Sequence, residues 1–309
     1  MRKLTIVGAG RVGEAAAQIL ARQDLVHEIV LIDVKEGAAA GVALDIQATA
    51  PLFRFDTRVT GTTDPAAMAD STLVVITAGV PRKPGMSRSD VLDTNVAILD
   101  GILDQVLRHA PEAIVLVVSN PVDVLTYRAW QRSGWPRGRV LGQAGVLDSS
   151  RMAAFIALET GLSAKHISAM VLGGHGDAMV PLIRYTTISG IGVDQFLDAA
   201  QIARIVERTR HGGAEVLALR KNSSAYDAPG AAIAEMVEAI LLDRKAILPT
   251  VAVLDGEYGE RGVAMGVPCV LGRAGVERIV SLALTDDEQG QFAVSAAAVR
   301  EDIARLPEA

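Results

Sequence analysis

The feature that most constrains the fold of this chain is a glycine-spaced turn near its N-terminus. Residues 8–13 read Gly-Ala-Gly-Arg-Val-Gly, follow the apolar segment Leu4–Val7 directly and open a segment of helical periodicity. Gly8 permits a tight turn, Gly10 lets a phosphate approach the backbone closely, and Gly13 lets the helix pack closely on the strand. The free N–H groups and positive dipole end of that helix favour a pyrophosphate. The pattern therefore predicts a βαβ unit that binds a dinucleotide.

An acidic residue ends the second predicted strand. Asp33 follows Glu28–Ile32 and comes twenty residues after Gly13. A carboxylate at this point accepts hydrogen bonds from both hydroxyls of the adenine ribose and repels a 2′-phosphate. This geometry favours NAD over NADP, and only the nearby Lys35 argues the other way. The alternative interpretation is a cluster of packing glycines with an incidental acidic strand end.

The first half of the chain alternates short β-rich segments with segments of helical spacing. Several β-rich segments are continuously apolar, which is typical of parallel strands covered on both faces. The alternation predicts an α/β fold, a Rossmann-type doubly wound parallel sheet with right-handed crossovers, whose ligands bind at the carboxyl ends of the strands. The expected strands are Leu4–Val7, Glu28–Ile32, Arg58–Gly61, Leu73–Thr77 and Ile114–Ser119, and the expected helices are Gly13–Arg22, Gly37–Thr49 and Asp90–His109.

The pattern loosens after about residue 145, which predicts a second, mixed α+β domain. We therefore expect a dinucleotide-binding domain at residues 1–145 and a substrate-binding, catalytic domain at residues 146–309. No Ser/Gly-rich linker separates the halves, so they should share one interface. The expected helices are Ser149–Glu159, Asp194–Arg208, Gly230–Leu242 and Asp286–Arg305, and the expected strands are Ile167–Leu172, Thr186–Ser189, Ile247–Leu254 and Gly262–Leu271.

The composition narrows the possible partners. Cys269 is the single cysteine of the 309 residues, so the chain has no internal disulfide and no thiolate metal site. The formal net charge of −6 argues against nucleic acid as the main partner. No apolar stretch approaches the roughly 20 residues that cross a bilayer. No small-residue cleavage site closes an N-terminal apolar segment. We expect a cytoplasmic protein that binds a small molecule and no metal.

Several polar residues fall at the predicted ligand edge of the sheet. Residues 80–88 form a loop after the fourth strand, because two prolines and a glycine forbid regular structure there. Asn120 ends the fifth strand. Asp148 and Arg151 are three apart at a predicted helix start and share one face. His175 lies within Gly-Gly-His-Gly-Asp, where the glycines leave its ring reachable. These residues are the candidates for chemistry.

Five segments occur in the order in which they are found in the lactate/malate dehydrogenase family, which the chain resembles over nearly its whole length. They are Gly-Ala-Gly-Arg-Val-Gly, Pro-Arg-Lys-Pro-Gly-Met-Ser-Arg, Ser-Asn-Pro-Val-Asp, Gly-Val-Leu-Asp-Ser-Ser-Arg and Gly-Gly-His-Gly-Asp. The resemblance is nearest to the lactate-dehydrogenase-like bacterial branch of the malate dehydrogenases. It implies reversible, NAD-dependent oxidation of (S)-malate to oxaloacetate within the tricarboxylic acid cycle. It also implies a homo-oligomer, with a tetramer favoured over a dimer.

The resemblance implies a role for each candidate. His175 would exchange the proton of the C2 hydroxyl, which suits an imidazole of ordinary pKa about 6.5. Asp148 would fix the imidazole tautomer and stabilise the imidazolium. Arg151 would bind the C1 carboxylate through two hydrogen bonds. Arg88 would polarise the C2 carbonyl, and Asn120 would bond the substrate oxygen near the nicotinamide. The expected cofactor contacts are Gly8, Gly10, Arg11, Val12, Gly13, Asp33, Asn95, Val118 and Asn120.

Arg82 decides the expected substrate. Malate and oxaloacetate carry a second carboxylate, whose desolvation in a closed site costs several kcal/mol unless a cation is fixed there. Arg82 resembles the malate-specific arginine of the family, where lactate-specific enzymes usually have a glutamine. Asp227 departs from the family pattern, because relatives more often have an aromatic residue there. We expect Asp227 to point to solvent or to a neighbouring subunit, and Ala225 to lie beside the substrate.

Three alternatives stay open at this point. The first is a lactate dehydrogenase, which has the same chemistry with a different acid. The second is a non-catalytic NAD-sensing module, which the complete set of His175, Asp148 and Arg151 disfavours. The third is an NAD-using glycosidase on a related scaffold, which would need a metal-binding cluster that Cys269 cannot supply alone.

Overall fold

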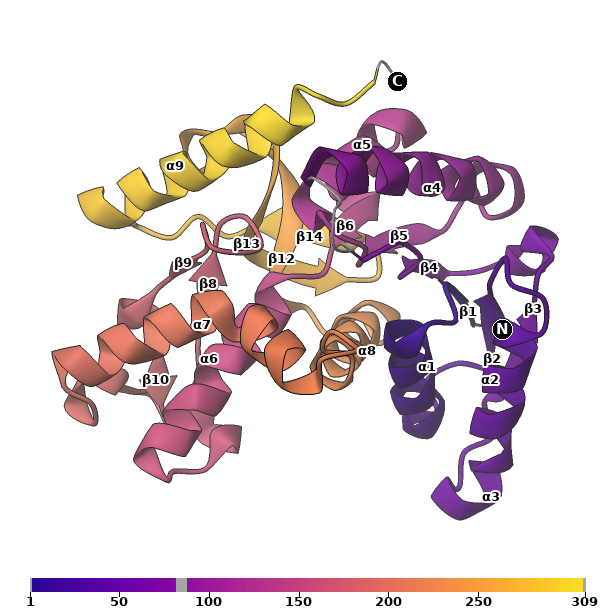
Figure 1. Ribbon diagram of the computed structural model, residues 1–309, viewed down its shortest axis with the longest axis horizontal. Coiled ribbons are helices and arrows are strands. Elements are labelled where there is room, and N and C mark those ends of the chain that lie inside the picture. Colours follow the sequence, from indigo (N-terminus) through magenta and orange to yellow (C-terminus); the bar gives the residue numbers. More distant parts are fainter. Residues whose placement is uncertain (1, 82–87, 308–309) are drawn as a thin grey trace.

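One large sheet organises the molecule (Figure 1). The computed structural model describes residues 2–81 and 88–307. Within them, nine strands pair side by side, and all of those near the centre of the sheet are buried. Their order across the sheet is β14 (Gly275–Ile279), β13 (Arg261–Gly272), β12 (Ala246–Asp255), β6 (Val140–Gly142), β5 (Ile114–Val117), β4 (Leu73–Ile76), β1 (Lys3–Val7), β2 (Glu28–Ile32) and β3 (Arg58–Thr62).

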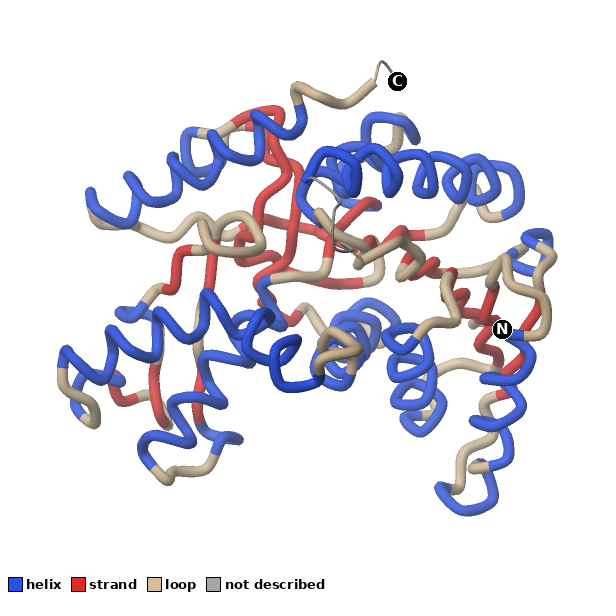
Figure 2. Tube along the Cα trace, viewed as in Figure 1, coloured by secondary structure: helices blue, strands red, loops and turns tan. Residues whose placement is uncertain are grey.

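The six strands from β6 to β3 are parallel and form the predicted doubly wound sheet. Their order reverses at β1 and β4, so the first and fourth strands are neighbours and a crevice opens at their carboxyl ends. Helices cover both faces of this sheet, as Figure 2 shows, which explains its continuously apolar strands. The helices of this half are α1 (Arg11–Gln23), α2 (Ala38–Ala48), α3 (Ala50–Phe53), α4 (Arg88–His109) and α5 (Val122–Ser133).

The remaining three strands extend the same sheet in the antiparallel sense. β12 and β13 form a long antiparallel pair, and β14 follows on the outer edge. The junction with the parallel part is the pairing of Val251 on β12 with Gly142 on β6. A Cβ at Gly142 would lie 2.3 Å from the Thr126 hydroxyl and 2.9 Å from the Val251 side chain, so only glycine fits at the junction. The predicted second half is therefore mixed α/β, but its longest strands continue the first sheet.

The rest of the second half consists of helices and two small sheets. The helices are α6 (Gly145–Thr160), α7 (Ala199–Arg220), α8 (Asp227–Leu241) and α9 (Asp286–Ile303). The small sheets contain β7 (Ile167–Ser168), β10 (Thr187–Ile188) and β11 (Ile191–Gly192) in one, and β8 (Val171–Leu172) and β9 (Val180–Pro181) in the other. No helix in the described ranges is long and apolar enough to cross a membrane.

Two elements of this half differ from the sequence prediction. The single strand expected at Ile167–Leu172 is divided into β7 and β8, which belong to different sheets. The helix expected at Asp194–Arg208 starts later, because Asp198 and Gln201 form a capping box that begins α7 at Ala199. The earlier residues 193–195 form a separate turn of 3-10 helix.

Candidate active site

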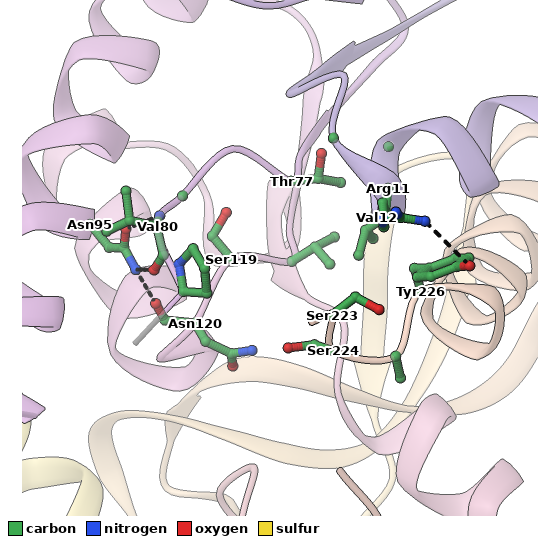
Figure 3. Close-up of a pocket in the computed structure, with 16 residues that line it drawn as sticks. Arg11, Val12, Thr77, Val80, Asn95, Ser119, Asn120, Ser223, Ser224 and Tyr226 are labelled. Atoms are coloured by element: carbon green, nitrogen blue, oxygen red, sulfur yellow. Dashed lines mark hydrogen bonds between the residues drawn. The ribbon is translucent and has the colours of Figure 1, made fainter. Parts of the chain in front are cut away.

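A cavity of about 300 Å³ opens where the carboxyl ends of β1, β4 and β5 meet (Figure 3). Its walls include the glycine turn, the segments that follow β4 and β5, and a segment between α7 and α8. Seven residues predicted to contact the cofactor line it, namely Gly10, Arg11, Val12, Gly13, Asn95, Val118 and Asn120. The sequence analysis did not predict Thr77, Gly79, Val80, Pro81, Ser119, Ser223, Ser224 and Tyr226, which also line it.

The glycine turn has the geometry that a dinucleotide needs. Gly8 has a φ of +108°, and a Cβ there would lie 2.6 Å from the Ala78 nitrogen. A Cβ at Gly13 would lie 1.9 Å from the Gly8 carbonyl oxygen. At Gly10, in contrast, a Cβ would meet no described atom within 4 Å, and no described side chain caps the start of α1 there. The open backbone and the uncapped helix start fit a pyrophosphate.

Asp33 is held beside this turn at the end of β2. Its carboxylate accepts the backbone N–H of Ala9 at 2.8 Å on Oδ2 and that of Lys35 at 3.0 Å on Oδ1. Each carboxylate oxygen can accept a further hydrogen bond, so the group stays able to bind a ribose diol. Gly8 and Asp33 are not among the residues that line the cavity. They support the turn instead, Gly8 through its positive φ and Asp33 through its hydrogen bond with Ala9.

Asn95 on α4 shapes the opposite wall. Its side-chain oxygen accepts the backbone N–H of Val80 at 2.8 Å, and its amide donates to the carbonyls of Val80 at 3.1 Å and Asn120 at 2.7 Å. These bonds, drawn in Figure 3, fasten the segments after β4 and β5 to each other. Asn95 therefore lies at the predicted site, and its polar atoms bond the backbone there.

The remaining wall comes from the segment before α8. Arg11 Nη1 donates to the hydroxyl of Tyr226 at 3.5 Å, and the Arg220 guanidinium lies 4.1 Å from the centre of the same ring. Figure 3 shows Ser223 and Ser224 between Tyr226 and Asn120. Asp227 is 72 % exposed and forms an ion pair with Arg220 at 2.7 Å. Its carboxylate thus faces solvent and a neighbouring cation rather than the cavity.

His175 lies between β8 and β9 and contacts the two residues that the sequence grouped with it. Its Nδ1 is 2.9 Å from Oδ2 of Asp148, whose Oδ1 accepts a hydrogen bond from Nη1 of Arg151 at 3.2 Å. Asp148 is almost fully buried, whereas the His175 side chain is 23 % exposed. The charge of Asp148 raises the pKa of His175 above its ordinary value, against the opposing effect of burial. The arrangement is that of a proton carrier oriented by a carboxylate.

The sequence analysis gave no role to Asp123, which lies in the first turn of α5. Its Oδ2 accepts the backbone N–H of His175 at 2.8 Å. Asp123 follows Asn120 by three residues, so this bond connects the cavity wall to the His175 loop. The residue was visible at the end of the Ser-Asn-Pro-Val-Asp segment. An acidic residue in a first helical turn has an ordinary explanation in the helix dipole, so the pattern did not single it out.

The structure does not describe the side chains of two predicted substrate-binding residues. Arg82 falls in the segment 82–87, which the structure does not describe. Arg88 begins α4, and its side chain also lies outside the described residues.

A catalytic metal has no candidate site in the described part of the chain. No group of three or more histidine, cysteine, aspartate or glutamate side chains there could hold a metal ion. Cys269 is buried in β13, and burial raises the pKa of its thiol. The described site contains an imidazole, a carboxylate and a guanidinium joined by hydrogen bonds, and a cavity beside the glycine turn.

Comparisons with known proteins agree with this geometry. Residues 2–142 match the family model for the lactate/malate dehydrogenase NAD binding domain, and residues 145–308 match that for the lactate/malate dehydrogenase alpha/beta C-terminal domain. A malate dehydrogenase of Thioalkalivibrio sulfidiphilus is 69 % identical over 99 % of this chain and 100 % of its own length.

Solved structures of both kinds of dehydrogenase are similar to the chain. A malate dehydrogenase from Salinibacter ruber has a TM-score of 0.94 and 46 % identity, covering 98 % of this chain and 96 % of its own. A Cryptosporidium parvum lactate dehydrogenase, solved with lactic acid and nicotinamide adenine dinucleotide, has a TM-score of 0.95 and 38 % identity over 99 % of both chains. The chain belongs to the lactate/malate dehydrogenase family, and its first half is an NAD-binding domain.

Proposed function

We propose that this chain is an NAD-dependent malate dehydrogenase that interconverts (S)-malate and oxaloacetate. The observation that supports this chemistry most directly is the hydrogen-bonded set of His175, Asp148 and Arg151. It combines a proton carrier, the carboxylate that orients it and a cation for the substrate carboxylate. The name of the relative at 69 % identity supports the choice of acid.

His175 moves the proton of the substrate hydroxyl. Its Nδ1 faces Asp148, so Nε2 is the nitrogen left for the substrate. During malate oxidation, Nε2 takes the proton from the C2 hydroxyl, and during oxaloacetate reduction it returns a proton to the C2 oxygen. NAD bound in the cavity supplies the hydride acceptor or, when reduced, the hydride donor for C2. Asp148 holds the ring and stabilises its charged form.

Cationic side chains bind the two carboxylates and the reacting oxygen. Arg151 binds the C1 carboxylate, and α7 packs over it, since a Cβ at Gly212 would lie 3.2 Å from the Arg151 Cδ. Arg88 polarises the C2 oxygen, and Asn120 bonds the same oxygen from the cavity wall. Arg82 binds the second carboxylate, which pyruvate lacks.

The first experiment compares substrates and cofactors in one assay. Turnover of oxaloacetate and of pyruvate is measured with NADH and with NADPH. We expect kcat/KM for oxaloacetate with NADH to exceed that for pyruvate by about a thousandfold, because pyruvate leaves Arg82 desolvated and unpaired. Faster turnover of pyruvate would identify the chain as a lactate dehydrogenase. Absence of turnover with either acid, with NADH still bound, would identify a non-catalytic NAD-sensing module.

The role of Arg82 is tested by Arg82→Gln. We expect kcat/KM for oxaloacetate to fall by about a hundredfold or more, because the second carboxylate loses its cation on desolvation. The value for pyruvate should stay the same or rise, so pyruvate serves as the internal control. Equal losses with both acids would show that another residue selects the substrate.

The oligomeric state, the cellular location and the pathway are also part of this proposal. Exposed apolar side chains support an oligomer, since Leu44, Leu52 and Leu158 are 73 %, 79 % and 73 % exposed. We propose a cytoplasmic homotetramer rather than a dimer, which acts in the tricarboxylic acid cycle. Residues 1–145 form the NAD-binding domain and residues 146–309 the substrate-binding, catalytic domain, and the first also contributes Arg82, Arg88 and Asn120 to the binding of the acid. Light scattering measures the mass, and a mass of one or two chains at working concentration would contradict the tetramer.

A further inference from the structure

Two side chains from different helices hold consecutive backbone N–H groups of the His175 loop. Asp123 on α5 accepts the N–H of His175 at 2.8 Å, and Ser295 on α9 accepts the N–H of Gly174 at 2.8 Å. Both side chains are buried, with Asp123 5 % and Ser295 0 % exposed. A neutral hydroxyl is therefore sufficient to anchor one of these N–H groups, whereas a carboxylate anchors the next.

Burial of the charged carboxylate of Asp123 at this position is energetically unfavourable. Its Oδ1 is inaccessible to solvent and has no hydrogen-bond partner in the described residues. Burial raises the pKa of Asp123 to about 6, and the nearby charge of Asp148 acts in the same direction. The backbone hydrogen bond from His175 has the largest opposing effect on this pKa, but it leaves Oδ1 without a partner in the described residues.

The charged group that also opposes this rise in the pKa of Asp123 is the imidazole of His175. The positive form of His175 lowers the pKa of Asp123, and Asp123 in turn raises the pKa of His175. We propose that Asp123 is a second carboxylate for His175, a positioning residue that fixes its backbone and stabilises its protonated ring in addition to Asp148. This inference rests on the proposed function, because it assigns Asp123 to the proton carrier of that reaction.

The other charged groups around His175 come from two more elements. Asp148 and Arg151 lie on α6, and the guanidinium of Arg151 opposes the protonated ring. On the α7 side, His211 lies 3.6 Å from Asp177, which is largely exposed. The contact from α9 is the neutral hydroxyl of Ser295, which accepts the N–H of Gly174. Among the described residues, Asp148 and Asp123 are therefore the two anions that raise the pKa of His175.

The test compares Asp123→Asn with Ser295→Ala. Asparagine keeps an acceptor for the His175 N–H and removes the charge, whereas the alanine variant removes the neighbouring anchor and no charge. The His175 ring is titrated by NMR in the chain without cofactor, and its signal is assigned by its loss in His175→Asn. We expect Asp123→Asn to lower the pKa of His175 by about half a unit or more, and Ser295→Ala to leave it unchanged.

The same shift should appear in the rates. The kcat/KM for oxaloacetate reduction falls as His175 loses its proton, so its basic limb should move to lower pH by the same amount in Asp123→Asn. The acidic limb of malate oxidation should move in the same direction, because that reaction needs the neutral ring. Ser295→Ala should leave the pH dependence of both profiles unchanged, whatever its effect on kcat, because it removes no charge.

The outcomes separate this inference from the proposed function. If the pKa of His175 does not shift in Asp123→Asn, or shifts equally in both variants, the inference is wrong. Asp123 would then only hold the backbone of His175. If Asp123→Asn does not fold, Asp123→Ser takes its place, since it offers the same kind of acceptor as Ser295. A wild-type chain that turns over neither acid contradicts the proposed function, whereas the NMR titration still decides whether Asp123 acts on His175.

Discussion

At the scale of single residues, the two nitrogens of His175 lie in different environments. Nδ1 faces the buried Asp148 at 2.9 Å, and the partly exposed ring leaves Nε2 for a ligand. Replacement by asparagine removes the titrating group at little cost in volume. We expect His175→Asn to lower kcat by about a thousandfold or more in both directions, because no other positioned group takes the proton.

The binding of NADH provides the control for this variant. Fluorescence titration should give nearly the same Kd for His175→Asn as for the wild type, because the cavity is lined by other residues. The exposed His166 offers a matched replacement, and His166→Asn should retain wild-type turnover. Substantial activity in His175→Asn would remove His175 from the mechanism.

The residues of the site differ in how far the sequence could predict them. His175, Asp148 and Arg151 have reactive side chains in recognisable local segments, and the structure joins them by hydrogen bonds. Asp123 acts on a backbone N–H 52 residues away, and a backbone group leaves no mark in the sequence. Tyr226 contacts Arg11 only because α8 packs against α1, which is also a non-local property.

At the scale of elements, the turn between β1 and α1 contains one glycine that packing requires, Gly13, and one that packing does not require, Gly10. A Cβ at Gly13 would lie 1.9 Å from the Gly8 carbonyl oxygen, so the backbone of the turn would have to shift to accommodate it. We expect Gly13→Ala to lower the free energy of unfolding by about 2 kcal/mol or more, because it overpacks a backbone contact. Denaturant unfolding measures this loss, and NADH affinity should fall as well.

Gly10→Ala is the matched variant in the same turn. A Cβ at Gly10 meets no described atom within 4 Å, and its φ of −75° suits alanine. Stability should change by less than about 1 kcal/mol, the usual cost of alanine at a helix N-cap. NADH affinity should nevertheless fall about tenfold, because the methyl group occupies the space through which a phosphate approaches the backbone. Unchanged affinity would place the pyrophosphate elsewhere.

The elements themselves were predicted best where a strand is almost entirely apolar or a helix is long. Glu28–Ile32 was predicted with its observed limits, and the expected Asp286–Arg305 matches α9 closely. The start of α7 was missed although Asp198 and Gln201 have capping-box spacing, since the preceding 3-10 turn extends the helical pattern. β7 and β8 are two residues each, too short for any period to appear.

At the scale of the whole molecule, one seam joins the parallel and antiparallel parts of the sheet. Both strand patterns were visible in the sequence, but the pairing of Gly142 with Val251 is set by contacts more than a hundred residues apart. An ion pair lies at the same seam. Arg137, before β6, donates to both carboxylate oxygens of Glu257 at 2.7 and 3.0 Å and to the carbonyl of Val253, on β12, at 3.0 Å.

This ion pair predicts how stability depends on pH. The Arg137 hydrogen bonds lower the pKa of Glu257 from 4.5 to about 2. Because the folded value is the lower one, the pair contributes fully above pH 4.5, and its contribution is lost as the pH falls toward 2. Arg137 is 41 % exposed, so solvent screens the pair. We expect Glu257→Gln to lose about 1 kcal/mol at neutral pH, well below the full linkage value.

Denaturant unfolding of the wild type and Glu257→Gln at pH 7 and at pH 3 measures this contribution. The difference between the two proteins should shrink at the lower pH, because at pH 3 the unfolded wild type binds a proton at Glu257 that the folded wild type largely does not, and this favours unfolding. Glu159→Gln is the control, since its partner Arg204 is 64 % exposed and the pair should contribute only a few tenths of a kcal/mol. A difference that does not change with pH would mean that Glu257 stabilises the seam through packing, and that its charge contributes nothing.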